Sequence, residues 1–243
     1  MKRRASQPIN TRRFPKGSTL VLGSLLLALA LRLYGVRAES LWMDEAFSLK
    51  LARMDLPTLV GWTSQDIHPP LYYILLHYWI ALGESEAVLR GLSVLAGVLN
   101  VGVTYTLGRT LLGKRTGYVA ALFLAVNPFH IWYSQETRMY AWLALLFSSS
   151  VLLALRAWRR ERCLTWIGYV LITTACLYTH YYAVFAILVE NVLFLYLFLQ
   201  KEVSSRGLLR WVGAQAAVLV LFLPWLPTFL LPITVGGGGW LSQ

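Results

Sequence analysis

Residues 68–86, HPPLYYILLHYWIALGESE, decide how this chain is arranged. The apolar part of this stretch has 14 residues, whereas a membrane-spanning helix needs about 20. As a span it would also place Glu84 and Glu86 inside and Lys114 and Arg115 outside, although lysine and arginine normally gather in cytoplasmic loops. The stretch therefore predicts a helix that lies along the outer membrane interface.

Composition indicates a protein of the membrane. Of the 243 residues, 57% are hydrophobic and 14% are charged, and the mean hydropathy is +0.57. Soluble domains carry about 25% charged residues. The net charge of +11 raises nucleic-acid binding as an alternative, but the basic residues fall in short bursts between apolar runs, as membrane topology requires. We expect a multi-pass protein of the cell membrane with no nucleic-acid partner.

Working outward from the interfacial stretch, the predicted fold class is an all-α polytopic membrane protein with seven transmembrane helices. Amphipathic interfacial helices are expected at 41–52 and 56–63, in the first outer loop. The expected domains are a basic cytoplasmic tail at 1–17, a first span at 18–36, an outer loop at 37–86, six further spans within 87–231 and an outer C-terminal segment at 232–243. The six later spans are expected at 87–107, 118–133, 139–157, 164–179, 181–199 and 209–230.

Charge sorting supports this topology. The inner side holds sixteen of the 22 lysines and arginines and only two acids, whereas the outer side holds eight acids and five basic residues. A cleaved signal peptide is the alternative for 18–36, because Val36-Arg37-Ala38 resembles a cleavage site. The long basic lead and Arg32 near the end of the run favour a span with a cytoplasmic N-terminus.

Several enzyme classes lack their motifs in this sequence. There is no GxSxG, no HExxH and no DxD. Residues 108–114 have the spacing of a phosphate-binding loop, but Arg115 stands where a serine or threonine would bind magnesium. Cys163 and Cys176 lie on one predicted helix, about 20 Å apart, which is too far for a disulfide.

Acidic residues gather in the first outer loop, where the pair Asp44-Glu45 begins a predicted helix. Anions at a helix N-terminus are stabilised by the helix dipole, which is a structural reason for the pair. A functional reason is that an ionised carboxylate can act as a general base or hold a metal. The spacing alone leaves both open.

A second polar segment, YSQETRMY at 133–140, lies at the outer junction of two predicted spans. Glu136 and Arg138 could form a local ion pair, or Arg138 could bind a phosphate with its fixed fork of donors. The tight hairpin favours the second interpretation.

Two histidines are expected on the same outer side. His68 precedes a stiff Pro-Pro pair, and His180 lies between two predicted spans. Together with Asp66 they are candidate ligands for a divalent metal, the one cofactor that these residues suggest. Glu190, in the middle of a span, is expected either to be functional or to be hydrogen-bonded inside the bundle, with Asn100 or Asn127 as partners.

The segments LWMDEAFSL, DIHPPLYYILLHYW, LRGLSVLAGVLNVGVTYTLGR and NPFHIWYSQETRMYAWLALL, in this order, resemble membrane glycosyltransferases of the C superfamily. The resemblance is to the protein O-mannosyltransferase-like branch, glycosyltransferase family 39, with the lipid A aminoarabinose transferases as relatives. It runs from about residue 41 to residue 227. Its most specific part is the Asp-Glu pair, with 22 residues between it and His-Pro-Pro.

The resemblance implies an inverting transfer of a hexose or pentose, with mannose as one candidate, from a polyprenyl-phosphate donor. The acceptor would be a protein, lipid or glycan on the outer face. Asp44 would be the catalytic base and Glu45 the second acid of the pair. Arg138, with Glu136 and Tyr140 in the same segment, would face the donor phosphate, and His68 would lie at a position where relatives carry a lysine.

The chain departs from the family by stopping soon after the seventh expected span, so the sequence predicts the N-terminal module of a longer architecture. Two other functions stay open at this point. One is a transporter or flippase of lipid-linked sugars, which would place polar sites at mid-membrane. The other is a truncated partner subunit without catalytic activity.

Overall fold

The computed structural model describes residues 17–160 and 162–234, and within these ranges the chain is helical, without strands. Seven of the described helices lie roughly parallel to one another: α1 (Gly17–Leu33), α5 (Glu86–Leu112), α6 (Lys114–Val126), α8 (Tyr140–Arg160), α9 (Cys163–Thr179), α10 (Ala183–Leu199) and α11 (Ser205–Phe222). The shorter elements are α2 (Met43–Ala52), α3 (Leu56–Thr63), α4 (Leu71–Trp79), η1 (Ile80–Leu82), α7 (Pro128–Ser134), η2 (Leu223–Trp225) and α12 (Leu226–Thr234).

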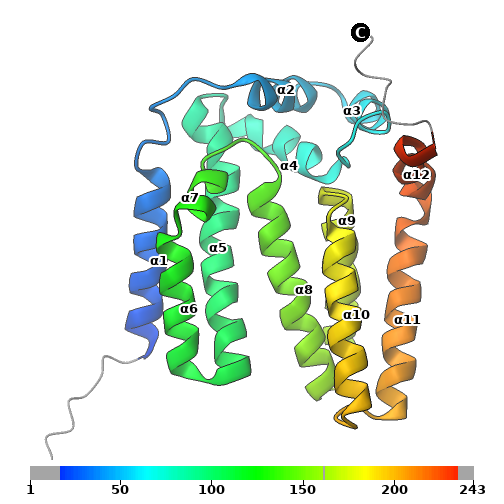
Figure 1. The fold of residues 1–243 in the computed structure, drawn as a ribbon. Coiled ribbons are helices and arrows are strands. Elements are labelled where there is room, and N and C mark those ends of the chain that lie inside the picture. Colours follow the sequence, from blue (N-terminus) through cyan, green and yellow to red (C-terminus); the bar gives the residue numbers. More distant parts are fainter. Residues whose placement is uncertain (1–16, 161, 235–243) are drawn as a thin grey trace, which may run out of the picture.

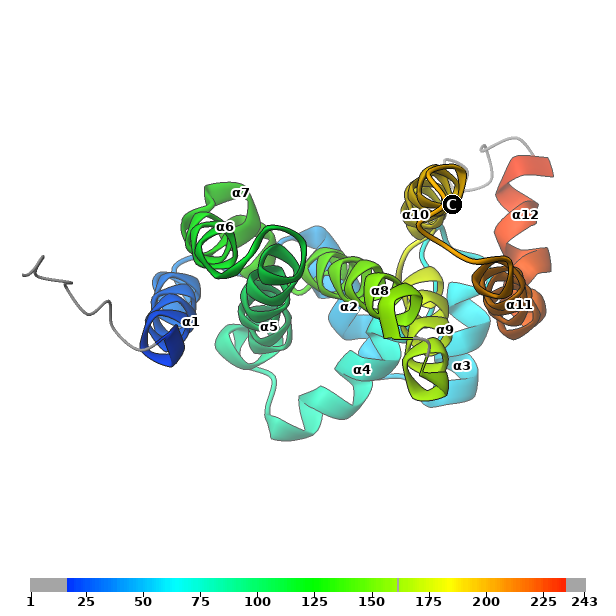
Figure 2. The same cartoon turned by 90° about the horizontal axis from the view of Figure 1, so that it is seen from below.

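The long helices form an elongated row rather than a closed ring, as the view along their axes shows (Figure 2). Helices α1, α5 and α6 pack together at one end of the row, and α8, α9 and α11 continue it. Helices α2, α3 and α4 lie across one end of the row (Figure 1). This crosswise layer is where the outer loop was expected.

By length and composition, three of the described helical stretches are suited to crossing a membrane: Glu86–Leu112, Tyr140–Arg159 and Ser205–Leu230. Four shorter helices are apolar as well: Thr19–Leu33, Leu71–Leu82, Cys163–Thr179 and Ala183–Leu199. The all-helical prediction is therefore confirmed. The number of spans and the interfacial position of the crosswise helices stay predictions.

The two ends of the row differ in charge. The connections α5–α6, α8–α9 and α10–α11 share the end opposite the crosswise layer (Figure 1). The basic residues described at that end are Arg109, Lys114, Arg115, Arg156, Arg159, Arg162, Lys201, Arg206 and Arg210. The crosswise layer and its junctions carry most of the acids, together with a smaller number of basic residues such as Lys50 and Arg53. The described basic residues are thus in excess at the end opposite the crosswise layer, as the topology argument requires.

One expected helix is broken, so the prediction of a continuous span at 118–133 was wrong. Helix α6 ends at Val126 and α7 starts at Pro128, a residue that cannot donate a backbone hydrogen bond to the preceding turn. The Asn127 side chain caps α7 by accepting from the His130 backbone N–H at 2.9 Å. The guanidinium of Arg32 donates to the carbonyls of Leu124 and Ala125 at the end of α6, so two carbonyls that the break leaves without a helical partner are bonded.

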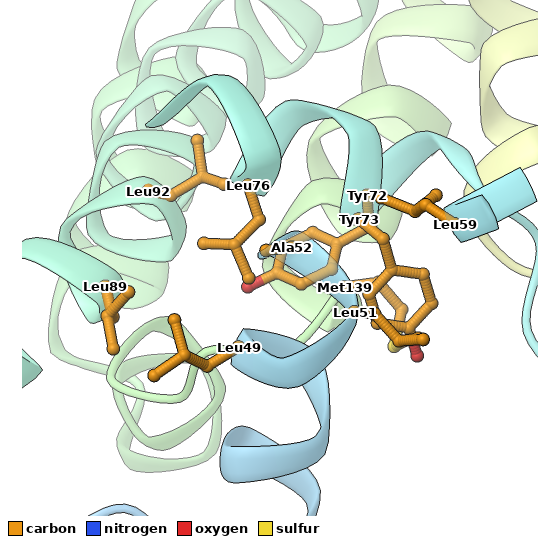
Figure 3. Packing of buried hydrophobic residues seen from close by; sticks show 10 residues of the cluster. All are labelled: Leu49, Leu51, Ala52, Leu59, Tyr72, Tyr73, Leu76, Leu89, Leu92 and Met139. Atoms are coloured by element: carbon orange, nitrogen blue, oxygen red, sulfur yellow. The ribbon is translucent and has the colours of Figure 1, made fainter. Parts of the chain in front are cut away.

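The crosswise layer has its own apolar core (Figure 3). Leu49, Leu51 and Ala52 of α2 pack against Tyr72, Tyr73 and Leu76 of α4, with Leu89 and Leu92 of α5, Leu59 of α3 and Met139 completing the cluster. Helix α3 starts where the Asp55 carboxylate accepts from the Thr58 N–H at 3.2 Å. Tyr72 and Tyr73 are fully buried here.

Glu190 is buried in the bundle, as one of the two expectations had it, but its predicted partners were wrong. Its carboxylate accepts hydrogen bonds from Ser150 of α8 and Tyr169 of α9. Asn100 and Asn127 are engaged elsewhere, Asn100 with His130 and Ser148 and Asn127 at the cap of α7. Satisfied partners at this depth favour a structural role for Glu190.

Candidate active site

Asp44 lies in the first turn of α2, directly above the long helices. Its side chain is 37% exposed, so a substrate can reach the carboxylate. The turn is fixed by the Ser48 hydroxyl, which donates to the Asp44 carbonyl at 2.8 Å. The structure thus offers an accessible carboxylate on a rigid helix end.

Arg138 faces Asp44 from the segment between α7 and α8. One terminal guanidinium nitrogen lies 3.5 Å from an Asp44 carboxylate oxygen, and the other donates to the Asp44 carbonyl at 3.4 Å. The Arg138 side chain is only 4% exposed. The buried Arg138 guanidinium therefore lies against the accessible Asp44 carboxylate. A buried cation in such a place can stabilise negative charge that develops on a bound group during a reaction.

The local ion pair between Glu136 and Arg138, one of the two alternatives from sequence, does not form. Glu136 instead accepts a hydrogen bond from the Trp132 indole at 2.7 Å, and Arg138 turns to Asp44. Burial raises the pKa of Glu136 above its ordinary value. Tyr140 lies next to Arg138, whose guanidinium carbon is 5.8 Å from the centre of the Tyr140 ring.

Glu45 differs from Asp44 in its exposure and in its hydrogen-bond partners. It is 0% exposed, and its carboxylate receives two hydrogen bonds from Arg90 of α5, at 2.9 and 2.7 Å. The same carboxylate accepts from the Thr137 N–H at 2.7 Å. Burial by itself raises the pKa of Glu45, but the Arg90 and Thr137 hydrogen bonds outweigh it and hold the pKa below its ordinary value.

The buried Glu45 carboxylate connects the two segments that carry Asp44 and Arg138. Thr137 precedes Arg138 and Glu45 follows Asp44, so one carboxylate fixes the spacing of both neighbours. Arg90 also donates to the carbonyls of Val36 and Glu39, at 2.8 and 2.9 Å. The chain leaving α1 is therefore anchored at the same point.

Asp66 and His68, two residues apart in the sequence, lie close to the distant His180 in the structure. His68 Nδ1 lies 3.7 Å from an Asp66 oxygen, and the His68 and His180 rings meet edge to face at 5.4 Å. Burial lowers the pKa of His180 to about 4, so its imidazole is neutral at pH 7. In the described part of the chain, no three His, Cys, Asp or Glu side chains are grouped as a metal site. The metal hypothesis thus gains no support from the geometry.

An apolar groove of about 310 Å³ begins beside these residues. Tyr140 lines one end, and the groove continues between α8 and α10 along Leu143, Phe147, Phe185 and Val189. Tyr140 therefore lies both in the lining of this groove and beside Arg138.

The sequence singled out Asp44 and Arg138, which the structure brings together, but it did not single out Arg90. Arg90 had a signal, because an arginine inside a long apolar run requires a partner. The sequence could not name that partner, because Glu45 lies 45 residues away.

Comparisons with known proteins show the family and the fold of the chain. The family model described as dolichyl-phosphate-mannose-protein mannosyltransferase matches residues 67–227. This range contains Arg138 but not Asp44. A comparison with curated proteins gives no match. Among solved structures, the chain is similar to the S. cerevisiae protein O-mannosyltransferase Pmt1-Pmt2 complex bound to the sugar donor, with a TM-score of 0.67 and 17% identity over 93% of this chain.

ArnT from Cupriavidus metallidurans in the apo state is similar to the same degree, with a TM-score of 0.67 and 15% identity over 92% of this chain. At these identities the likeness establishes the fold. The chain spans 34% of the first structure's chain and 45% of the second's. Since the family model covers more than half of the residues, the chain belongs to the dolichyl-phosphate-mannose-protein mannosyltransferase family.

Proposed function

We propose that this chain carries the catalytic residues of a glycosyltransferase that uses a polyprenyl-phosphate-linked sugar. The observation that carries the proposal is the pairing of a reachable carboxylate, Asp44, with a buried guanidinium, Arg138, at 3.5 Å. Family membership supports the reaction class. The sugar would be a hexose or pentose, with mannose as one candidate, and the acceptor a protein, lipid or glycan.

In the proposed reaction, Asp44 accepts the proton of an acceptor hydroxyl. The acceptor oxygen attacks the anomeric carbon, and the bond from that carbon to the phosphate oxygen breaks with inversion. The electron pair stays on the departing lipid phosphate. Arg138 stabilises the charge that develops there, because a buried cation in a site of low dielectric interacts strongly with it.

The apolar groove beside Tyr140 suits the lipid part of the donor. A polyprenyl chain needs an apolar path into the membrane, and the groove lies between α8 and α10 with almost entirely apolar lining. Its upper end is next to Arg138, whose guanidinium lies near the Tyr140 ring. Phosphate and tail would therefore occupy adjoining sites.

Glu45 and Arg90 would act as positioning residues in this scheme. Glu45 is fully buried and saturated with hydrogen bonds, so we assign it no contact with substrate. We also propose that the crosswise layer faces the outside of the cell membrane, because the opposite end holds the basic connections. The reaction would then take place on the outer face.

Asp44→Asn tests the proposal. The amide keeps the shape of the side chain but cannot accept the proton, and loss of a positioned base costs about 10²–10⁴-fold in rate. Glu39→Gln is the matched control, because Glu39 is an exposed acid of the same loop. Transfer of labelled sugar from polyprenyl phosphate in membranes containing each variant is the measurement. Normal turnover by Asp44→Asn, with Glu39→Gln also normal, would show that Asp44 only stabilises its helix.

A further inference from the structure

Glu190 is a buried acid to which the proposed reaction gives no part. Its carboxylate accepts hydrogen bonds from the Ser150 hydroxyl of α8 and, at 2.8 Å, from the Tyr169 hydroxyl of α9. All three side chains are buried. A carboxylate among the long apolar helices is costly unless it is bonded, so these hydrogen bonds hold α8, α9 and α10 together at one level of the bundle.

The Ser150–Glu190 hydrogen bond lies at the end of the apolar groove that is further from the crosswise layer. The groove lining ends at Phe147 on α8 and at Val189 on α10. Ser150 follows Phe147 by three residues, and Glu190 follows the lining residue Ala186 by four. Residues three or four apart lie on one face of a helix. The hydrogen bond therefore joins the two walls of the groove one turn beyond its last lining residues.

Beyond this hydrogen bond, side chains fill the space between α8 and α10. Ala154 and Phe194 belong to one buried cluster, and each follows a residue of the Ser150–Glu190 pair by four positions. The Phe194 ring lies 5.5 Å from that of Trp158 and stacks on Trp211 of α11 at 4.8 Å. The two helices thus enclose a groove on one side of the pair and a packed core on the other.

The next residue of α10, Asn191, makes a useful comparison because it is bonded toward α11. Its side-chain oxygen accepts from the Trp211 indole at 2.9 Å, and its nitrogen donates to the Ile187 carbonyl at 2.8 Å. Asn191 does not line the groove. It therefore supports α10 at the same depth as Glu190 without joining the groove walls.

We propose that Glu190, bonded to Ser150, closes this end of the groove and thereby determines how much of the polyprenyl chain the protein holds. The groove runs from Tyr140 to Phe147, about 10 Å along α8. A chain that went deeper would separate the carboxylate from its donors, and an unbonded carboxylate in an apolar site is costly. The rest of the chain would leave sideways into the membrane, past the exposed Val189. The inference rests on the proposed function, because it concerns the lipid of that same donor.

Photolabelling of the membrane-reconstituted protein tests the inference. The probe is a polyprenyl phosphate longer than the groove, with a diazirine at the far end of its chain, and mass spectrometry identifies the labelled residues. In the wild type we expect no label at Tyr169, which lies behind Glu190. Glu190→Ala lengthens the groove by about one turn, roughly 5 Å, so label at Tyr169 should appear. Asn191→Ala is the matched control and should label like the wild type.

The wild type alone can overturn the inference, because label at Tyr169 in that protein would show that Glu190 does not close the groove. Glu190→Ala that unfolds like the wild type and stays unlabelled at Tyr169 would overturn it too. Equal labelling of Tyr169 in Asn191→Ala and Glu190→Ala would show a general loosening of α10 instead. A second probe carries the diazirine next to the phosphate. If it left the groove unlabelled in a protein that transfers sugar, the inference would fall and the reaction class would stand, whereas absence of both labelling and transfer would contradict both.

Discussion

Arg138 combines three contacts in one buried guanidinium: the Asp44 carboxylate, the Asp44 carbonyl and the face of Tyr140. A lysine could retain the charge but not this fork of donors. We therefore expect Arg138→Lys to keep part of the activity with a raised donor requirement, and Arg138→Ala to keep almost none. Activity measured at increasing concentrations of polyprenyl-phosphate sugar, for the wild type and the two variants, tests this expectation.

Arg53 provides the control for that series. It forms an ion pair with Glu84 next to the crosswise layer, but its side chain is 57% exposed, and exposed ion pairs contribute little. Arg53→Lys and Arg53→Ala should therefore titrate like the wild type. If the Arg138 variants also gave curves identical to the wild type, Arg138 would have no part in donor binding.

At the scale of elements, the Glu45–Arg90 pair holds α2 against α5 and the segment before α8. Glu45→Gln would leave the Arg90 guanidinium buried without its counterion, which costs about 3–5 kcal/mol. Replacing both residues, as in Glu45→Gln with Arg90→Met, should recover part of the loss because no unpaired charge remains. Thermal unfolding of the purified proteins tests whether the double variant is more stable than Glu45→Gln and less stable than the wild type. A Glu45→Gln protein as stable as the wild type would contradict the prediction.

The same pair makes the stability of the crosswise layer depend on pH. Because the pKa of Glu45 in the folded protein lies below its ordinary value of 4.5, its stabilising contribution is complete above about pH 4.5 and is lost as pH falls through the folded value. As the pH is lowered below 5, the free energy of unfolding of the wild type should therefore fall by more than that of Glu45→Gln. Parallel slopes for the two proteins would show that Glu45 does not titrate with folding.

At the scale of the whole molecule, the separation of charges predicts which end faces the cell exterior. A membrane-impermeant maleimide applied to intact cells should label Glu84→Cys in the crosswise layer. It should miss the native Cys163, which is exposed at the basic end, until the membrane is permeabilised. Labelling of Cys163 alone in intact cells would reverse the orientation and move the proposed reaction to the inner face.

The sequence by itself determined the class of the protein, because apolar run length and charge asymmetry are local properties of the chain. It also identified Asp44 and Arg138, since carboxylates and arginines at the ends of apolar runs are conspicuous. It did not determine the break at Asn127-Pro128, where a proline, an asparagine cap and the distant Arg32 act together. It also did not show that Glu45 is buried on Arg90 while Asp44 stays accessible. Adjacent residues on a helix point in different directions, and only packing decides which carboxylate is buried in the core and which stays exposed.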